Sequence, residues 1–199
     1  MPIRIYQTKD NSVSVDQARY DTYIVAKYLD TITFKSSTRF YKTTLTSDMI
    51  FTKADAYTND EKVERLTREF NIHYRACIGS LIYFLSTRVH LGFAVQKLKK
   101  FSENPVIVNF EGLVHVLRYI RDNRTLGLKY YADRNDANLS NLLRQGNIKT
   151  ENPLMGFSDS SWQDSPDTAR STGAYIIFYQ GGTFDHDTHV PGLVAQSSA

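Results

Sequence analysis

The 199-residue sequence has a single cysteine, Cys77, and no uninterrupted run of about 18 apolar residues. A membrane-spanning helix needs such a run, so the sequence excludes one. The residues after Met1 lack the apolar core of a signal peptide, and we therefore expect an intracellular protein of the cytoplasm or nucleus. Cys77 lies within an apolar pattern, which indicates a small buried residue rather than a reactive thiol.

Several catalytic motifs are also missing. The pair Ser197–Ser198 lacks the glycines of a nucleophile elbow, and no glycine-rich phosphate loop precedes a helix. The sequence contains no internal repeat and no low-complexity segment. With 41% hydrophobic and 23% charged residues, it has the composition of an ordinary globular protein of one or two domains.

The charges are unevenly distributed along the chain. The segment from Arg88 to Lys129 contains eight Lys and Arg residues and three acids, which gives a net charge of 8 − 3 = +5. The segment from Glu151 to Asp187 contains six acids and one arginine, which gives a net charge of 1 − 6 = −5. A basic region beside an acidic one suggests a phosphate-binding surface next to a cation site. Solvated helix faces would give similar counts, so both interpretations stay open.

Apolar residues recur at helical spacing in five segments, which are 16–29, 60–70, 74–87, 91–101 and 110–120. Ser14 and Gln17 have the spacing of a capping box before the first helix, and Asn59 or Asp60 can cap the second. The last three helices predict a compact antiparallel bundle. Gly79 would cost up to about 1 kcal/mol there unless another helix approaches it closely. The first helix also needs a surface to lie on, which we expect from an upstream domain.

The remaining segments suggest strands and connections. Residues 11–15 and 126–131 are strand-like, whereas 31–59 suggests a long ordered connection and 132–153 an insertion or linker. Residues 154–162 predict a short strand that delivers Asp159 to its end, followed by a turn and a β-rich run closed by Gly181 and Gly182. Together these patterns predict an α+β fold.

Many short motifs in collinear order resemble the Pol polyprotein of copia-type LTR retrotransposons. They begin with Val-Asp-Gln-Ala-Arg-Tyr at 15–20, Tyr-Arg-Ala-Cys-Ile-Gly-Ser-Leu-Ile-Tyr at 74–83, Ser-Thr-Arg at 86–88 and Phe-Ala-Val at 93–95. They continue with Phe-Ser at 101–102, Asn-Pro at 104–105, Leu-Arg-Tyr-Ile at 117–120, Leu-Gly-Leu at 126–128, Gly-Phe-Ser-Asp-Ser-Ser-Trp at 156–162, Arg-Ser-Thr-Gly at 170–173 and Val-Ala-Gln-Ser-Ser-Ala at 194–199.

The resemblance implies an α+β chain with a three-helix thumb-like bundle, followed by the first antiparallel strands of a ribonuclease H-like sheet. It divides the chain into five parts. These are the end of the reverse-transcriptase palm at 1–31, a connecting segment at 32–72, the thumb-like bundle at 73–125, a connection at 126–153 and a truncated ribonuclease H-like domain at 154–199.

The resemblance also implies functional residues. Asp159 would be the first catalytic carboxylate and a ligand of the Mg²⁺ pair that such a nuclease needs. Lys97 and Lys100, and likewise Arg118 and Arg121, are three residues apart, which places each pair on one helix face suited to the backbone of an RNA/DNA hybrid or primer-template duplex. The rest of the Pol polyprotein would be the other partner.

The same comparison argues against activity in this chain. No Asp-Asp dipeptide occurs, so the polymerase pair is missing, and the next nuclease carboxylate would follow Ala199. We therefore expect weak metal binding and no hydrolysis. The function of the parent Pol polyprotein would be RNA-directed DNA synthesis, with cleavage of the RNA strand of the hybrid. Two alternatives remain, a catalytically dead or domesticated nucleic-acid-binding module and a decayed element without function.

Some positions depart from the family pattern or have ordinary explanations. Val89-His90-Leu91 stands where Pro-Asp-Ile is usual, Ser161 replaces an acid, and 183–190 replaces a lysine-rich turn. The acids and histidines at 185–189 could bind metal, but a solvated turn is the favoured interpretation. Core packing is favoured over base stacking for Trp162. Asp159 itself could be an Asx-turn residue.

Overall fold

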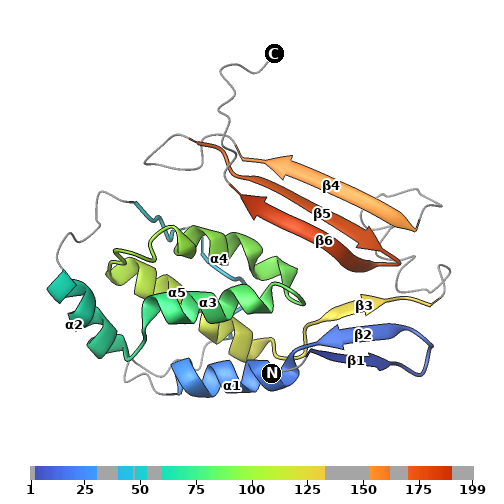
Figure 1. Ribbon diagram of the computed structural model, residues 1–199, viewed down its shortest axis with the longest axis horizontal. Coiled ribbons are helices and arrows are strands. Elements are labelled where there is room, and N and C mark those ends of the chain that lie inside the picture. The colour runs from blue at the N-terminus through green and yellow to red at the C-terminus, as the bar shows by residue number, and fades with distance from the viewer. Residues whose placement is uncertain are drawn as a thin grey trace, which may run out of the picture.

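The computed structural model describes residues 3–30, 40–46, 48–52, 60–132, 153–161 and 170–189. The predicted cap at Asn59, most of the linker and the residues Trp162, Ser197 and Ser198 lie outside this part of the chain. The fold is α+β, with a body of helices and two antiparallel three-stranded sheets (Figure 1). No described helix has both the length and the apolar character that a membrane crossing requires.

The helical body contains every helix that the periodicity predicted. The elements are α1 (Ala18–Ile24), which continues as a π-helix at Val25–Leu29, α2 (Asp60–Phe70), α3 (Tyr74–Phe84), a 3₁₀ turn (Val89–Leu91), α4 (Gly92–Lys99) and α5 (Ile107–Asp122). Helix α5 begins one turn earlier than its apolar stripe suggests. The buried Asn109 explains this, since its side-chain oxygen accepts the N–H of Val106 at 2.8 Å and caps the first turn.

Two expectations about α1 are wrong. Ser14 does not cap it, because Ser14 lies in a strand opposite Tyr6; Asp16 Oδ1 instead accepts the N–H of Ala18 at 3.1 Å. Nor does the helix need an external surface. Its continuation packs on α5 of the same chain, where Ile24 and Val25 are almost completely buried.

A single apolar core joins these helices. Phe70 stacks on Phe110 with ring centroids 5.1 Å apart, and the Tyr74 hydroxyl donates to the Leu98 carbonyl at 2.9 Å. Cys77 is fully buried within this core, and burial raises the pKa of its thiol. The interpretation of Cys77 as a packing residue is confirmed.

Gly79 and Gly112, which lie in the middle of α3 and α5, have different surroundings. Among the residues that the structure describes, nothing lies within 4 Å of the position that a Cβ would take at Gly79, so no described helix approaches it closely. At Gly112 in α5, the same position lies 2.9 Å from Phe51 Cζ and 3.1 Å from Leu98 Cδ2. Gly112 therefore makes the close approach that the sequence suggested for Gly79.

The first sheet has the order β1 (Arg4–Gln7), β2 (Val13–Asp16), β3 (Leu128–Tyr130). The second has the order β4 (Leu154–Ser160), β5 (Gly173–Tyr179), β6 (Gly182–His189). The solvated turn expected at 185–189 is wrong, because 182–189 is strand β6. Gln180 and Gly181 both have positive φ, of 49° and 79°, and form the tight hairpin turn that sends β6 back along β5.

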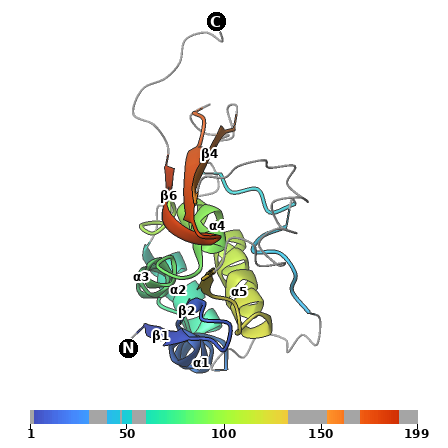
Figure 2. The same ribbon diagram turned by 90° about the vertical axis from the view of Figure 1, so that its right-hand side faces the viewer.

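The second sheet lies over the helical body and touches the first sheet (Figures 1 and 2). The N–H of Tyr131, just after β3, donates to the Gln180 carbonyl at 2.9 Å, and the Tyr130 hydroxyl donates to the Thr183 carbonyl at 2.6 Å. On the other side, His186 Nε2 lies 3.0 Å from the Leu85 carbonyl oxygen after α3. Strand β6 is thus fixed to both the helices and β3, whereas β4 is the strand farthest from the helical body.

Candidate functional site

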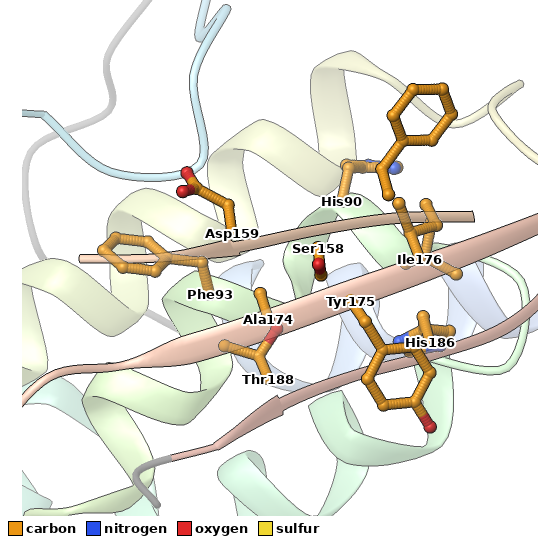
Figure 3. A pocket seen from close by; sticks show the side chains of 11 residues that line it. His90, Phe93, Ser158, Asp159, Ala174, Tyr175, Ile176, His186 and Thr188 are labelled. Carbon is orange, nitrogen blue, oxygen red and sulfur yellow. The ribbon is translucent and has the colours of Figure 1, made fainter. Parts of the chain in front are cut away.

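A pocket of about 460 Å³ lies between the second sheet and the start of α4 (Figure 3). The 3₁₀ turn and α4 supply Val89, His90 and Phe93 to its wall. All three strands of the sheet supply the facing wall, including Phe157, Asp159, Ala174, Ile176, His186 and Thr188. The pocket therefore contains Asp159, the predicted metal ligand.

Strand register orders the sheet side of this pocket into two rows. Asp159 pairs with Ala174, which pairs with Thr188. Phe157 pairs in the same way with Ile176, and Ile176 with His186. Because residues two apart in a strand point to the same face, both rows face the helices. One row places a carboxylate beside small side chains, and the other is largely apolar.

Asp159 lies near the end of β4, as predicted, and its side chain is exposed. Its Oδ1 atom accepts the N–H of Ser160, the next residue, at 2.8 Å. An Asx turn would instead use the N–H two residues on, so this contact is not the Asx turn that the sequence suggested. In the described part of the chain, no three His, Cys, Asp or Glu residues gather where they could hold a metal ion. The donor set found here does not fit a two-metal centre, and the metal role of Asp159 stays a prediction.

The acids and histidines at 185–189 are divided between the two faces of β6. His186 points toward the helices and contacts Leu85. On the outer face, Asp185 accepts the Tyr175 hydroxyl at 3.2 Å, and Asp187 lies 3.0 Å from His189. Alternation along the strand thus separates the cluster that the sequence had suggested.

Arg118 and Arg121 have partners within the molecule. Arg118 donates to the Tyr41 hydroxyl at 3.0 Å, and Arg121 pairs with Asp122 at 2.7 Å. Burial works to raise the pKa of Asp122, but hydrogen bonds from Arg121 and from the Tyr41 N–H outweigh it, so the pKa is lowered. These two arginines help to hold segment 40–46 on the side of α5 away from α3 (Figure 2). Their role in nucleic-acid binding stays a prediction.

Lys97 and Lys100 lie near the C-terminal end of α4. The Lys97 ammonium is 5.2 Å from the centre of the Phe93 ring. Lys100 lines a second depression, of about 440 Å³, together with Lys99 and with Arg75 of α3. We call it the basic groove; the remaining residues that line it are Ile78, Gly79, Ile82, Ser102 and Glu103.

Sequence reasoning did not single out Arg75 and Lys99. The sequence did contain one indication of the groove, because Arg75 and Gly79 are four residues apart and therefore lie on one face of α3. What the sequence could not supply was the packing of the α4 end beside that face. The basic groove places three cations around an uncovered stretch of helix, against one carboxylate, Glu103.

Arg88, which stands in the Ser-Thr-Arg motif, is buried rather than exposed. Its guanidinium forms an ion pair with the buried Asp21 of α1 and donates to the Asn123 carbonyl at 2.7 Å. Arg88 therefore ties the loop after α3 to α1 and to the end of α5. Its role here is structural.

Comparisons with known proteins agree with a retrotransposon origin. The chain is 30% identical over 129 residues to the protein described as secreted RxLR effector protein 161 from Plasmopara viticola, covering 64% of this chain and 80% of that protein. It is 29% and 30% identical over 105 residues, or 53% of this chain, to the retrovirus-related Pol polyproteins from transposons RE1 and RE2 of Arabidopsis thaliana. Those matches span 6% of each polyprotein.

No family model and no solved structure matches the chain. The first relative is nevertheless covered over four-fifths of its length, and the polyprotein matches extend over half of this chain. The chain therefore belongs to the family of the Plasmopara viticola protein described as secreted RxLR effector protein 161, and it is a retrotransposon-related protein.

Proposed function

We propose that this chain is a copia-type Pol segment, with the thumb of the reverse transcriptase and the first strands of ribonuclease H, that acts as a duplex-binding module. It holds an RNA/DNA hybrid or primer-template duplex by the phosphate backbone and does not cleave it. The observation that carries the proposal is the basic groove. Lys99, Lys100 and Arg75 surround it, and all three side chains are exposed.

The groove suits a phosphate backbone for two physical reasons. Three cations against one carboxylate leave an excess of positive charge, and neutralised phosphates release counterions. Gly79 also leaves the wall of α3 open, because no part of the described chain lies within 4 Å of the position of a Cβ there. A backbone can therefore approach α3 more closely than it could approach a larger residue.

The geometry around Asp159 supports the proposal that the chain does not cleave the duplex. A two-metal centre needs several converging carboxylates, whereas no other acid lines its pocket in the described part of the chain. Asp159 would be one Mg²⁺ ligand in an intact Pol protein. A single exposed carboxylate binds Mg²⁺ weakly, since this ion keeps most of its waters.

The second candidate function is a secreted role. The name of the Plasmopara viticola relative states such a role for that protein. The tetrapeptide Arg-x-Leu-Arg that the name spells does not occur in these 199 residues. We favour the duplex-binding function because a specific surface supports it.

The proposal is tested by the salt dependence of binding to a fluorescently labelled RNA/DNA hybrid. Each phosphate contact contributes about 0.9 to the slope of log K against log salt concentration. The variant K99Q/K100Q should therefore reduce the slope by about 1.8. The variant K9Q/R19Q is the matched control, because it removes two exposed cations of the N-terminal hairpin and α1 and should leave the slope unchanged.

Three results would count against the proposal. An equal loss in both variants would mean that net charge, not the basic groove, drives binding. Failure to bind at any salt concentration would favour a decayed element. Cleavage of the hybrid that depends on Mg²⁺ and disappears in Asp159→Asn would show that the chain is a nuclease after all.

A further inference from the structure

The pocket beside Asp159 has the walls of a site for a small ring-shaped molecule. Phe93 of α4 and Phe157 of β4 expose 49% and 43% of their surface, which is unusual for phenylalanine. Val89, Ala174 and Ile176 complete an apolar lining. The volume of about 460 Å³ is within the range of small-molecule sites, roughly 300 to 1,000 Å³. Apolar and aromatic walls of this size favour a flat ligand over a polymer.

The polar group that would orient such a ligand is the Asp159 carboxylate. Its Oδ1 atom accepts one hydrogen bond, from the Ser160 N–H, and in the described part of the chain no donor reaches Oδ2. An ionised carboxylate only accepts hydrogen bonds, and its two oxygens suit a pair of adjacent N–H groups. The pocket thus selects a ligand that presents two such donors on one edge.

The charges around the pocket decide whether the ligand is a cation. Lys97 lies over the Phe93 ring, and Arg88, two residues before His90, is buried in its ion pair with Asp21. Partial burial and the Arg88 charge lower the pKa of His90 to about 4, so this ring is neutral near pH 7. A cationic ligand would gain attraction from Asp159 but would be repelled by Lys97, whereas the charge of Arg88 is compensated by Asp21. Neutral N–H donors avoid that repulsion.

We propose that this pocket binds an uncharged planar heteroaromatic ring with two adjacent N–H donors, the edge that guanine presents. The ring lies against Phe93 and Phe157, and its donors pair with Asp159. The site differs from the basic groove, which has charged walls and lies against α3. The inference does not rest on duplex binding.

Calorimetry on the full chain with free nucleosides tests the proposal. Guanosine should bind about tenfold or more tightly than inosine, which lacks the 2-amino donor, because a hydrogen bond to a charged acceptor is lost. Adenosine, without the paired donors, should bind as weakly as inosine. Benzamidine presents two donors on a cation and should bind more weakly than guanosine.

Four variants locate the site. Asp159→Asn should remove the preference for guanosine over inosine, whereas Asp187→Asn, the same change on the outer face of β6, should keep it. Ala174→Leu fills the floor of the pocket and should abolish binding of every nucleoside. The groove variant K99Q/K100Q should bind guanosine normally, which separates this site from the duplex-binding function. Thermal unfolding checks that each variant is folded.

The proposal is overturned by any of four results. These are no measurable binding of guanosine, equal binding of guanosine and inosine, tighter binding of benzamidine than of guanosine, and unchanged binding in a folded Ala174→Leu variant.

Discussion

Gly79 and Gly112, the glycines in the middle of α3 and α5, provide a matched test of the packing. In an exposed helix interior, Gly→Ala removes backbone entropy from the unfolded chain and stabilises the helix by up to about 1 kcal/mol. Gly79 meets this condition, since an added Cβ would have no described neighbour within 4 Å. Gly79→Ala should therefore raise the free energy of unfolding by about 1 kcal/mol, or the melting temperature by about 2–4 °C.

Gly112→Ala has the same helical benefit but meets a packed wall. The new methyl group would lie 2.9 Å from Phe51 Cζ and 3.1 Å from Leu98 Cδ2, and overpacking of this kind costs about 1–3 kcal/mol. The net change should lie between about zero and 2 kcal/mol of destabilisation. Phe51→Leu in the Gly112→Ala background should recover part of the loss, because the contacting ring is removed.

Urea denaturation followed by circular dichroism at the helical band measures both variants. The reasoning is refuted if Gly112→Ala stabilises the protein as much as Gly79→Ala does. A second readout links stability to function: Gly79→Ala should weaken hybrid binding even though it stabilises the fold, because the methyl group projects into the basic groove.

Two further predictions concern the interior and the second sheet. Arg88→Met leaves Asp21 buried without its counter-ion and should destabilise the protein by about 3–5 kcal/mol, while Asp21→Leu with Arg88→Met should recover much of this. Burial already raises the pKa of Asp21 to about 6 against the opposing effect of Arg88. Removing Arg88 should raise this pKa further, because Arg88 is what lowers it. A carboxyl with a raised folded pKa contributes stability that is lost as the pH rises from the ordinary aspartate range through the folded pKa, so urea midpoints of Arg88→Met should keep falling above pH 6, which is about the pKa of Asp21 beside Arg88. A flat profile, or a single-variant cost below about 1 kcal/mol, would contradict this. In native-state hydrogen exchange, β4 and β5 should be less protected than α3 and α5, since β4 is almost entirely exposed, and the opposite ranking would contradict the described packing.

The helices could be predicted because each buries one face, and a buried face leaves a 3.6-residue period in the sequence. Their ends were less predictable. The start of α5 depends on the amide of Asn109, and that of α1 on Asp16 rather than on Ser14. Strand β6 leaves no such period. Its polar residues form a strand because the turn at Gln180 and Gly181 pairs them with β5.

The candidate sites could be predicted only in part. Asp159 was expected at a strand end and is found there, but its pocket depends on where α4 lies against the sheet, a tertiary contact. Arg88 was missed as a core residue because charged side chains are rarely buried. Its partner Asp21 lies far from it in the sequence, so no local pattern indicates the pairing. Arg118 and Arg121 share a helix face as predicted, yet segment 40–46 packs there.

The pairing of β2 with β3 has a consequence for how the chain folds. Helices α3, α4 and α5 follow one another in the sequence, so packing them together closes only short loops. The ion pair between Lys129 and Asp10, in contrast, joins residues 119 positions apart. Closing so long a loop costs entropy that only a formed helical body can offset. We therefore expect the first sheet to assemble after the helices. Since β3 also contacts the hairpin turn of β5 and β6, substitutions at Tyr130 should slow the final phase of refolding more than the first.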